Sequence, residues 1–270
     1  MRRHGDDEVH EHDRGLSHDL PVLARRRMIR LLAGAGAAAG LVPLVGCTAE
    51  GASSSAADCA RVPEETAGPY PGDGSNGVNV LKESGVVRSD ITRSFGDSAG
   101  STAEGVPLTC TLTVVDAASG CATPATPRKG AAVYVWHCDR EGGYSLYTEG
   151  VTDENYLRGV QETDEKGRVT FTSVFPGCYT GRWPHIHFEV YGSLRDATSA
   201  TAITSTSQLA LPKDVCEAVY ATAGYERSVD HLGRLSLESD SVFGDGHDQQ
   251  LATVRGSVEE GYTATLTVAV

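Results

Sequence analysis

The chain has 270 residues, of which 40% are hydrophobic, and a formal net charge of −13 at pH 7. This apolar fraction is enough to build a core and excludes wholesale disorder. Residues 1–46 contain seven Arg and six Asp or Glu, so residues 47–270 carry a charge of −14. An acidic body without a basic stripe repels phosphate backbones, and this excludes nucleic acid as a partner.

The N-terminal segment has the order of charge, apolar length and cysteine that is typical of an export signal. Arg25 and Arg26 precede an apolar stretch over residues 31–45, and Cys47 follows it. About 15 residues at ~1.5 Å each are too short to cross a hydrocarbon core of ~30 Å, which favours a signal peptide over a spanning helix. The arginine pair is similar to a twin-arginine export signal, and the residues around Cys47 resemble a lipobox. The alternative is a short buried helix that ends at a chance cysteine.

We therefore predict a signal peptide over residues 1–46, a flexible tether over residues 47–58 and one folded domain over residues 59–270. The tether is rich in Thr, Ala, Gly and Ser, which cannot bury enough apolar area to fold. Two acyl chains on Cys47 would anchor the exported protein stably to a membrane, where one chain would be marginal. The predicted location is therefore extracytoplasmic, at a membrane or cell surface. The oligomeric state stays open.

Short strand-like segments recur through the domain between dense Gly, Pro, Asp and Ser breaks. Alternation of apolar residues with threonine or other polar residues is the clearest strand pattern, and helical periodicity is weak. We predict strands over residues 108–115, 131–138, 168–174, 183–191 and 262–270, and one short helix over residues 212–220. Many short strands with few helices predict a single all-β domain, an antiparallel β-sandwich.

His185 and His187 stand two residues apart in the predicted strand over residues 183–191. Because side chains alternate along a strand, both imidazoles point to one face, while Ile186 and Phe188 point to the other and can enter the core. This spacing suits two ligands on one metal ion. Surface histidines on a half-buried strand are the commoner explanation of the motif by itself, so the motif alone leaves metal binding open.

Two tyrosines in turns stand in a specific order with these histidines. Tyr144 lies in G-G-Y-S after the segment V-W-H-C-D, and Tyr179 ends P-G-C-Y, six residues before His185. Together with G-R-W-P-H-I-H-F-E-V, these segments resemble the intradiol ring-cleavage dioxygenases, which include the catechol and protocatechuate dioxygenases. The segment E-T-A-G-P-Y over residues 65–70 is also similar to a segment of that family. The resemblance covers about residues 60–212.

The resemblance implies a mononuclear Fe(III) site held by Tyr144, Tyr179, His185 and His187. Phenolates are hard anionic donors that suit Fe(III), whereas two histidines with one carboxylate are typical of Fe(II) oxygenases. The implied activity is cleavage of a catechol ring between its two hydroxylated carbons with O2. In the family, the catechol displaces one tyrosinate, which can then accept a substrate proton. The position in the motif assigns this role to Tyr179.

Two further active-site residues are implied by the same resemblance. Arg182 matches the family's arginine beside the first histidine and would stabilise negative charge that develops on the substrate. Its alternative role is a surface ion pair. Gln208 resembles a glutamine near the family's site, although we expect it on a connecting loop. His137 matches no ligand of the family, and we predict a structural role for it.

The chain contains seven cysteines and no C-x-x-C pair, which disfavours a zinc ribbon. If Cys47 is lipidated, six remain, an even number that suits disulfides after export or, alternatively, buried free thiols. Similar extracellular family members carry cysteines at the positions of Cys121 and Cys138, so the resemblance implies that these two pair. The other four would then form two more bridges: Cys59, Cys110, Cys178 and Cys216.

The sequence also departs from the family pattern. The interval over residues 180–184 is short, Trp183 stands where the family often has proline, and no helical N-terminal region precedes the domain. The identity of the catechol substrate therefore stays open. Two non-enzymatic alternatives remain: a sandwich module that has lost catalysis and binds an aromatic or carbohydrate ligand, and a cell-surface domain in which these histidines and tyrosines only pack.

Overall fold

The computed structural model describes residues 61–270 except residues 99, 118–124 and 199–201. The predicted signal peptide, tether and lipidated Cys47 lie outside the described residues, so export and anchoring stay predictions. Within the described part of the chain, no helix combines the length and apolarity that a membrane crossing requires.

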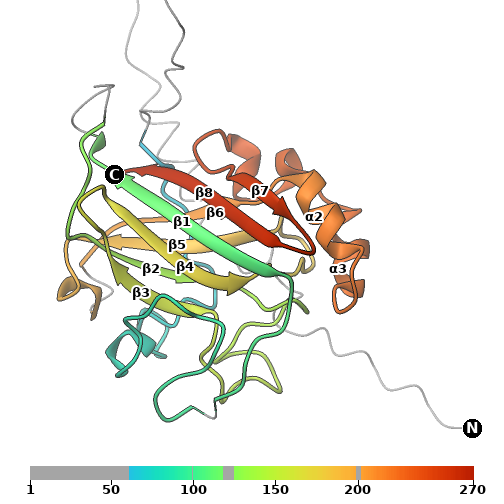
Figure 1. The fold of residues 1–270 in the computed structure, drawn as a ribbon, viewed down its shortest axis with the longest axis horizontal. Helices are drawn as coiled ribbons and strands as arrows, with labels where there is room; N and C mark the ends of the chain where they lie inside the picture. The colour runs from blue at the N-terminus through green and yellow to red at the C-terminus, as the bar shows by residue number, and fades with distance from the viewer. Residues whose placement is uncertain (1–60, 99, 118–124, 199–201) are drawn as a thin grey trace, which may run out of the picture.

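In the described part of the chain, two four-stranded sheets form the domain, which confirms the all-β prediction (Figure 1). The first sheet has the order β4-β1-β8-β7, and the second has the order β3-β2-β5-β6. The strands are β1 (Pro107–Val115), β2 (Ala132–Trp136), β3 (Arg158–Glu162), β4 (Arg168–Val174), β5 (His185–Tyr191), β6 (Ile203–Ala210), β7 (Thr253–Ser257) and β8 (Gly261–Ala269). Helices α2 (Lys213–Tyr220) and α3 (Glu226–Leu232) lie together at one end of the sandwich, and the 3-10 turns are η3 (Val80–Lys82), η5 (Asp196–Thr198), η7 (Leu237–Ser239) and η8 (Phe243–Asp245).

The five predicted strands and the predicted helix are present, with ends shifted by no more than two residues. The sequence patterns did not reveal β3, β6, β7 or α3. One strand pair also differs from the antiparallel prediction, because β1 and β8 run parallel, with Leu108 opposite Tyr262 (Figure 1). These strands come from opposite ends of the domain, so no hairpin forces them to be antiparallel.

The core between the sheets follows from the alternation of side chains along the strands. Leu108, Cys110 and Leu112 of β1 point into it, and threonines between them face outward. Ile186 and Phe188 enter the same core from β5, as predicted. Burial of one such large apolar side chain stabilises the fold by about 1.5–3 kcal/mol.

A second interior lies on the outer face of the second sheet. Tyr134 and Trp136 of β2 pack there against Tyr70 and Leu81 from the segment that precedes β1. The amide of Glu65 donates to the carbonyl oxygen of Thr206 on β6, at 2.7 Å, and helps to hold this segment across the sheet. As a result, all seven residues of β5 are buried. This second interior contains both histidines of the H-x-H motif.

The four described cysteines are buried free thiols: Cys110, Cys138, Cys178 and Cys216. The structure therefore does not contain the predicted bridge between Cys138 and Cys121, and Cys121 and Cys59 lie outside the described residues. The Cys138 sulfur instead lies 3.5 Å from the carbonyl oxygen of Gly177. Buried thiols behave as small hydrophobic groups in a core, and this alternative describes all four.

Candidate metal centre

Two histidines and two tyrosines converge on one point of the second interior. The Nε2 atoms of His185 and His187 lie 3.0 Å apart. The hydroxyl oxygens of Tyr179 and Tyr144 lie 3.3 and 3.5 Å from Nε2 of His185, and 3.4 Å from each other. Bonds of about 2.0–2.2 Å to one metal ion would bring nitrogen and oxygen donors to such separations. The predicted ligand residues are therefore brought together.

A single residue holds the loops that carry the two tyrosines. The Asp139 carboxylate accepts from the amide of Gly143, at 2.8 Å, directly before Tyr144. The Asp139 carbonyl oxygen accepts from the amide of Gly177, at 2.9 Å, two residues before Tyr179. Burial raises the pKa of the Asp139 carboxyl above its usual value. Both phenols thus reach the histidines from turns that are tied to the end of β2.

The two imidazoles are oriented in different ways. The Nδ1 atom of His185 lies 2.5 Å from the carbonyl oxygen of Trp183, so Nδ1 carries the proton and Nε2 directs a lone pair at the site. His187 stacks on Trp136, with ring centroids 4.8 Å apart and an angle of 7° between the rings. Gly68 closes the other side, because a Cβ atom there would lie 3.5 Å from Cε1 of His187. The φ of +71° at Gly68 also favours glycine.

Burial favours the neutral forms of His185, His187 and Tyr144. It lowers the pKa of His185 to about 3, with the Arg182 charge as the next cause. It also lowers the pKa of His187 well below its ordinary value, followed by the effects of His185 and Arg182. Burial raises the pKa of Tyr144 well above 10. Both imidazoles therefore offer lone pairs at neutral pH, and a bound cation would reverse the preference of the Tyr144 phenol for the protonated form.

The chemistry of these donors fits Fe(III). Among the described residues, no group of three or more His, Cys, Asp or Glu side chains could hold a metal ion, so phenol oxygens are needed to complete a site here. Two hard phenol oxygens with two imidazoles suit a ferric ion, whereas soft thiolate donors would suit zinc or copper.

Arg182 is buried beside this centre and does not form the surface ion pair considered as its alternative. Its Nη2 donates to Oε1 of Gln208 at 2.6 Å, and its Nε donates to Oδ2 of Asp240 at 3.2 Å. Gln208 lies on β6 opposite His187, not on a loop as predicted. Its Nε2 donates to the carbonyl oxygen of Thr66 at 2.9 Å. The arginine is thus linked to segments from both ends of the domain.

Some neighbours of the site were not predicted from the sequence. Trp136 lies on the outer face of β2, and the pairing of β2 with β5 sets it opposite His187. Asp240 belongs to no motif. Trp183, which stands where the family often has proline, packs in the core between the sheets, and its Nε1 donates to the carbonyl oxygen of Leu211 at 2.8 Å. His137 bonds to Ser173 and to a backbone carbonyl, which agrees with a structural role.

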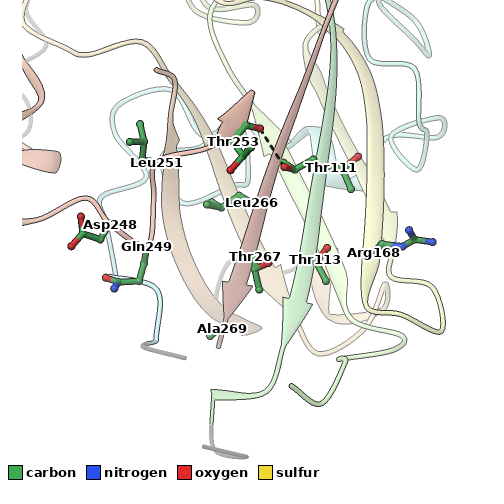
Figure 2. Close-up of a pocket in the computed structure, with 11 residues that line it drawn as sticks. Thr111, Thr113, Arg168, Asp248, Gln249, Leu251, Thr253, Leu266, Thr267 and Ala269 are labelled. Carbon is green, nitrogen blue, oxygen red and sulfur yellow. Dashed lines mark hydrogen bonds between the residues drawn. The ribbon is translucent and has the colours of Figure 1, made fainter. Parts of the chain in front are cut away.

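A separate surface depression of about 490 Å³ lies on the outer face of the first sheet (Figure 2). Threonines from β1, β7 and β8 line it, and the hydroxyl of Thr265 donates to the carbonyl oxygen of Thr253 at 3.2 Å. None of the lining residues is a histidine or cysteine. A threonine hydroxyl without an adjacent base is a weak nucleophile, so the depression suggests no catalytic chemistry.

Comparisons with known proteins agree with this geometry. A family model described as dioxygenase matches residues 87–226, a range that includes the four converging residues. An intradiol ring-cleavage dioxygenase from Tetranychus urticae has a similar structure, with a TM-score of 0.59 and 26% identity, over 78% of this chain and 94% of that chain. A chlorocatechol 1,2-dioxygenase from Rhodococcus opacus is 37% identical over 57 residues, which is 21% of this chain. That match spans only 22% of the relative's length.

Proposed function

Because this chain belongs to the intradiol ring-cleavage dioxygenase family, we propose that it uses Fe(III) and O2 to cleave a catechol ring between its two hydroxylated carbons. The observation that carries the proposal is the convergence of two phenol oxygens and two imidazole nitrogens, with neighbouring atoms 3.0–3.5 Å apart. Tyr144, Tyr179, His185 and His187 would hold the ion. When bound, ferric iron would supply the Lewis acidity and redox chemistry that make a chelated catechol reactive toward O2.

Tyr179 is the best candidate for the proton acceptor in this reaction. It is 6% exposed, whereas Tyr144 and the two histidines are only 1–3% exposed. It also follows a glycine-containing turn outside the strands, so it can move with less disturbance than a histidine in β5. In the proposed reaction, the Tyr179 phenolate oxygen would accept the proton of a catechol hydroxyl.

Arg182 would stabilise negative charge that develops on the substrate oxygens. A guanidinium held by buried partners needs little reorganisation when charge develops near it, which is the condition for a large electrostatic contribution. Gln208 supports this role because it links Nη2 of Arg182 to the carbonyl oxygen of Thr66. The segment that carries Thr66 also covers the outer face of the second sheet, and this cover would exclude water from the reacting atoms.

We also propose that the enzyme acts outside the cytoplasm as a lipid-anchored protein. The ordered arginine pair, apolar stretch and Cys47 support export and lipidation. Residues 59–270 would then form the dioxygenase domain, held at the membrane by a flexible tether over residues 47–58.

Metal analysis, visible spectroscopy and O2 uptake on the iron-loaded protein test the proposed reaction. We expect one iron per chain, a phenolate charge-transfer band, and O2 uptake with at least one catechol from a panel. The product should be a dicarboxylate that carries both atoms of O2. The variants His185→Ala and His187→Ala should lose most of the iron. The matched control is Tyr225→Phe, which alters a buried tyrosine whose hydroxyl donates to the carbonyl oxygen of Phe175.

Two results would count against the proposed function. If the iron-loaded protein is colourless, the phenols do not bind the metal, and a binding module takes the place of the enzyme. If the histidine variants consume O2 as fast as the Tyr225→Phe control, the reaction does not occur at this site.

A further inference from the structure

Asp240 contacts the buried arginine from a part of the chain that the family match does not include. It lies between η7 and η8, beyond residue 226, where that match ends. Its Oδ2 accepts from Nε of Arg182 at 3.2 Å and from the amide of Trp183 at 2.6 Å. The side chains of Asp240 and Arg182 are 0% and 1% exposed. The pair is therefore shielded from water, unlike a surface ion pair.

The Asp240 carboxylate is itself held in place. Its Oδ1 accepts from the amides of Val242 and Phe243, at 2.8 and 3.1 Å. The amide of Asp240 donates to the carbonyl oxygen of Ser236 at 3.1 Å. Both carboxylate oxygens thus have backbone partners, so the group presents a fixed acceptor to the guanidinium.

These contacts fix both the backbone after Arg182 and its side chain. Asp240 holds the backbone directly after Arg182 through the amide of Trp183, and it holds the side chain through Nε. Oε1 of Gln208 accepts a hydrogen bond from Nη2, on another edge of the guanidinium plane. A planar guanidinium that is bonded on two edges has its direction set, which a single contact would not achieve.

We propose that Asp240 is a positioning residue for ring cleavage, which aims the Arg182 guanidinium at the metal centre and balances its buried charge. The inference rests on the proposed function. No hydrogen bond described above joins Asp240 to any of the four proposed ligand side chains, and its side-chain partner is Arg182.

The test is Asp240→Asn in the iron-loaded, full-length protein. An asparagine has one side-chain oxygen, so it can serve the amides of Val242 and Phe243 or the donors of Trp183 and Arg182, but not both. We expect kcat to fall by on the order of 10²-fold, the cost of a small misplacement of a reacting group. The iron content, the resting visible band and the band formed with catechol under anaerobic conditions should match wild type. The KM for catechol should stay within about threefold, because the lost interaction is made in the transition state.

Asp164→Asn is the matched control. Asp164 also accepts from two turn amides, those of Lys166 and Arg168, and pairs with an arginine side chain, but both partners are about half exposed. We expect wild-type kcat for this variant. If Asp240→Asn has the same kcat as Asp164→Asn, the proposed role of Asp240 is wrong. A loss of iron from Asp240→Asn in step with kcat would also overturn it, because Asp240 would then support the metal site and not the arginine.

A second pair of variants covers the case in which Asp240→Asn does not fold, since removal of one partner leaves a buried charge without its counter-ion. Arg182→Gln is compared with Arg182→Gln combined with Asp240→Asn. If Asp240 acts through Arg182, the second substitution should lower kcat by no more than about twofold. A further large loss would overturn the inference. Wild-type protein without the iron band would overturn the proposed function and this inference together, whereas an active wild type with a fully active Asp240→Asn would overturn the inference alone.

Discussion

Trp136 stacks on His187, with ring centroids 4.8 Å apart and an angle of 7° between the rings. The two residues face each other across the antiparallel pair of β2 and β5. The Nδ1 atom of His187 is buried and has no hydrogen-bond partner among the described residues. The indole, and not a hydrogen bond at Nδ1, therefore orients this imidazole toward the other proposed ligands.

Replacement of Trp136 should consequently weaken iron binding without removing a ligand. We expect Trp136→Leu to lower the iron affinity by about 10- to 100-fold, the usual effect of losing a group that orients a metal ligand. Trp136→Phe keeps an aromatic face and should retain most of the affinity. Competition with a chelator measures both variants, and equal affinities for Trp136→Leu and wild type would show that the stack does not orient His187.

Substitution of Tyr179 and of Tyr144 should have different effects on the enzyme, because only Tyr179 is proposed to receive a proton. In Tyr179→Phe, turnover of catechol should fall more than the iron content, since the proton acceptor is lost. In Tyr144→Phe, the charge-transfer band should shift or bleach, because this phenolate stays bound during the proposed reaction. Metal analysis, visible spectra and O2 uptake on both variants check this. Equal O2 uptake per iron in Tyr179→Phe and wild type would contradict the assignment of Tyr179.

His137 should make the fold sensitive to mild acid. Burial lowers its pKa to about 4. Because the unfolded residue has a pKa of about 6.5, the unfolded state binds more protons as the pH falls, and stability is lost between about pH 6.5 and pH 4. Between pH 7 and pH 5, the free energy of unfolding should fall by about 2 kcal/mol because of His137.

The comparison of wild type with His137→Gln isolates that contribution. The variant lacks the titrating group, so its free energy of unfolding should fall by about 2 kcal/mol less than that of wild type between pH 7 and pH 5. Urea unfolding at the two pH values, with equal iron loading, provides the measurement. Parallel losses in both proteins would show that His137 does not control this acid sensitivity.

The buried thiols should be unreactive in the folded protein. Burial raises the pKa of Cys110 and of Cys178 to about 12, so the reactive thiolate is scarce at neutral pH. An alkylating reagent should label none of the four described cysteines before unfolding and all four after it. Peptide mapping without reduction checks the result. Detection of a Cys121–Cys138 bridge would instead support the pairing implied by the family resemblance.

If the protein is anchored outside the cytoplasm as proposed, its attachment to the membrane depends on Cys47. Cys47→Ser removes the site of lipidation, so the protein should move from the membrane to the soluble fraction after export. Cell fractionation with an antibody to the domain measures this. If Cys47→Ser stays with the membrane to the same extent as wild type, lipid on Cys47 is not the anchor.

The local sequence pattern was sufficient to predict those strands and side-chain directions that depend on near neighbours in sequence. Alternation along residues 168–174 predicted β4 with both ends correct. The same rule placed His185 and His187 together, and Ile186 and Phe188 in the core, because successive side chains of a strand point to opposite faces. β3 and β7 were missed because each contains glycine and polar residues, which weaken the alternation.

The tertiary structure decided everything that depends on which distant segments meet. No local pattern sets Trp136 against His187, pairs β1 with β8 in parallel, or puts Gln208 on a strand. The segment before β1 buries the outer face of β5, and this burial keeps the two imidazoles neutral. Asp240 reaches Arg182 across 58 positions of sequence, by a contact that exists only because the turn between η7 and η8 packs beside the start of β5. The residue types of the candidate metal centre were thus determined by the sequence, while its surroundings were determined by long-range packing that local periodicity does not encode.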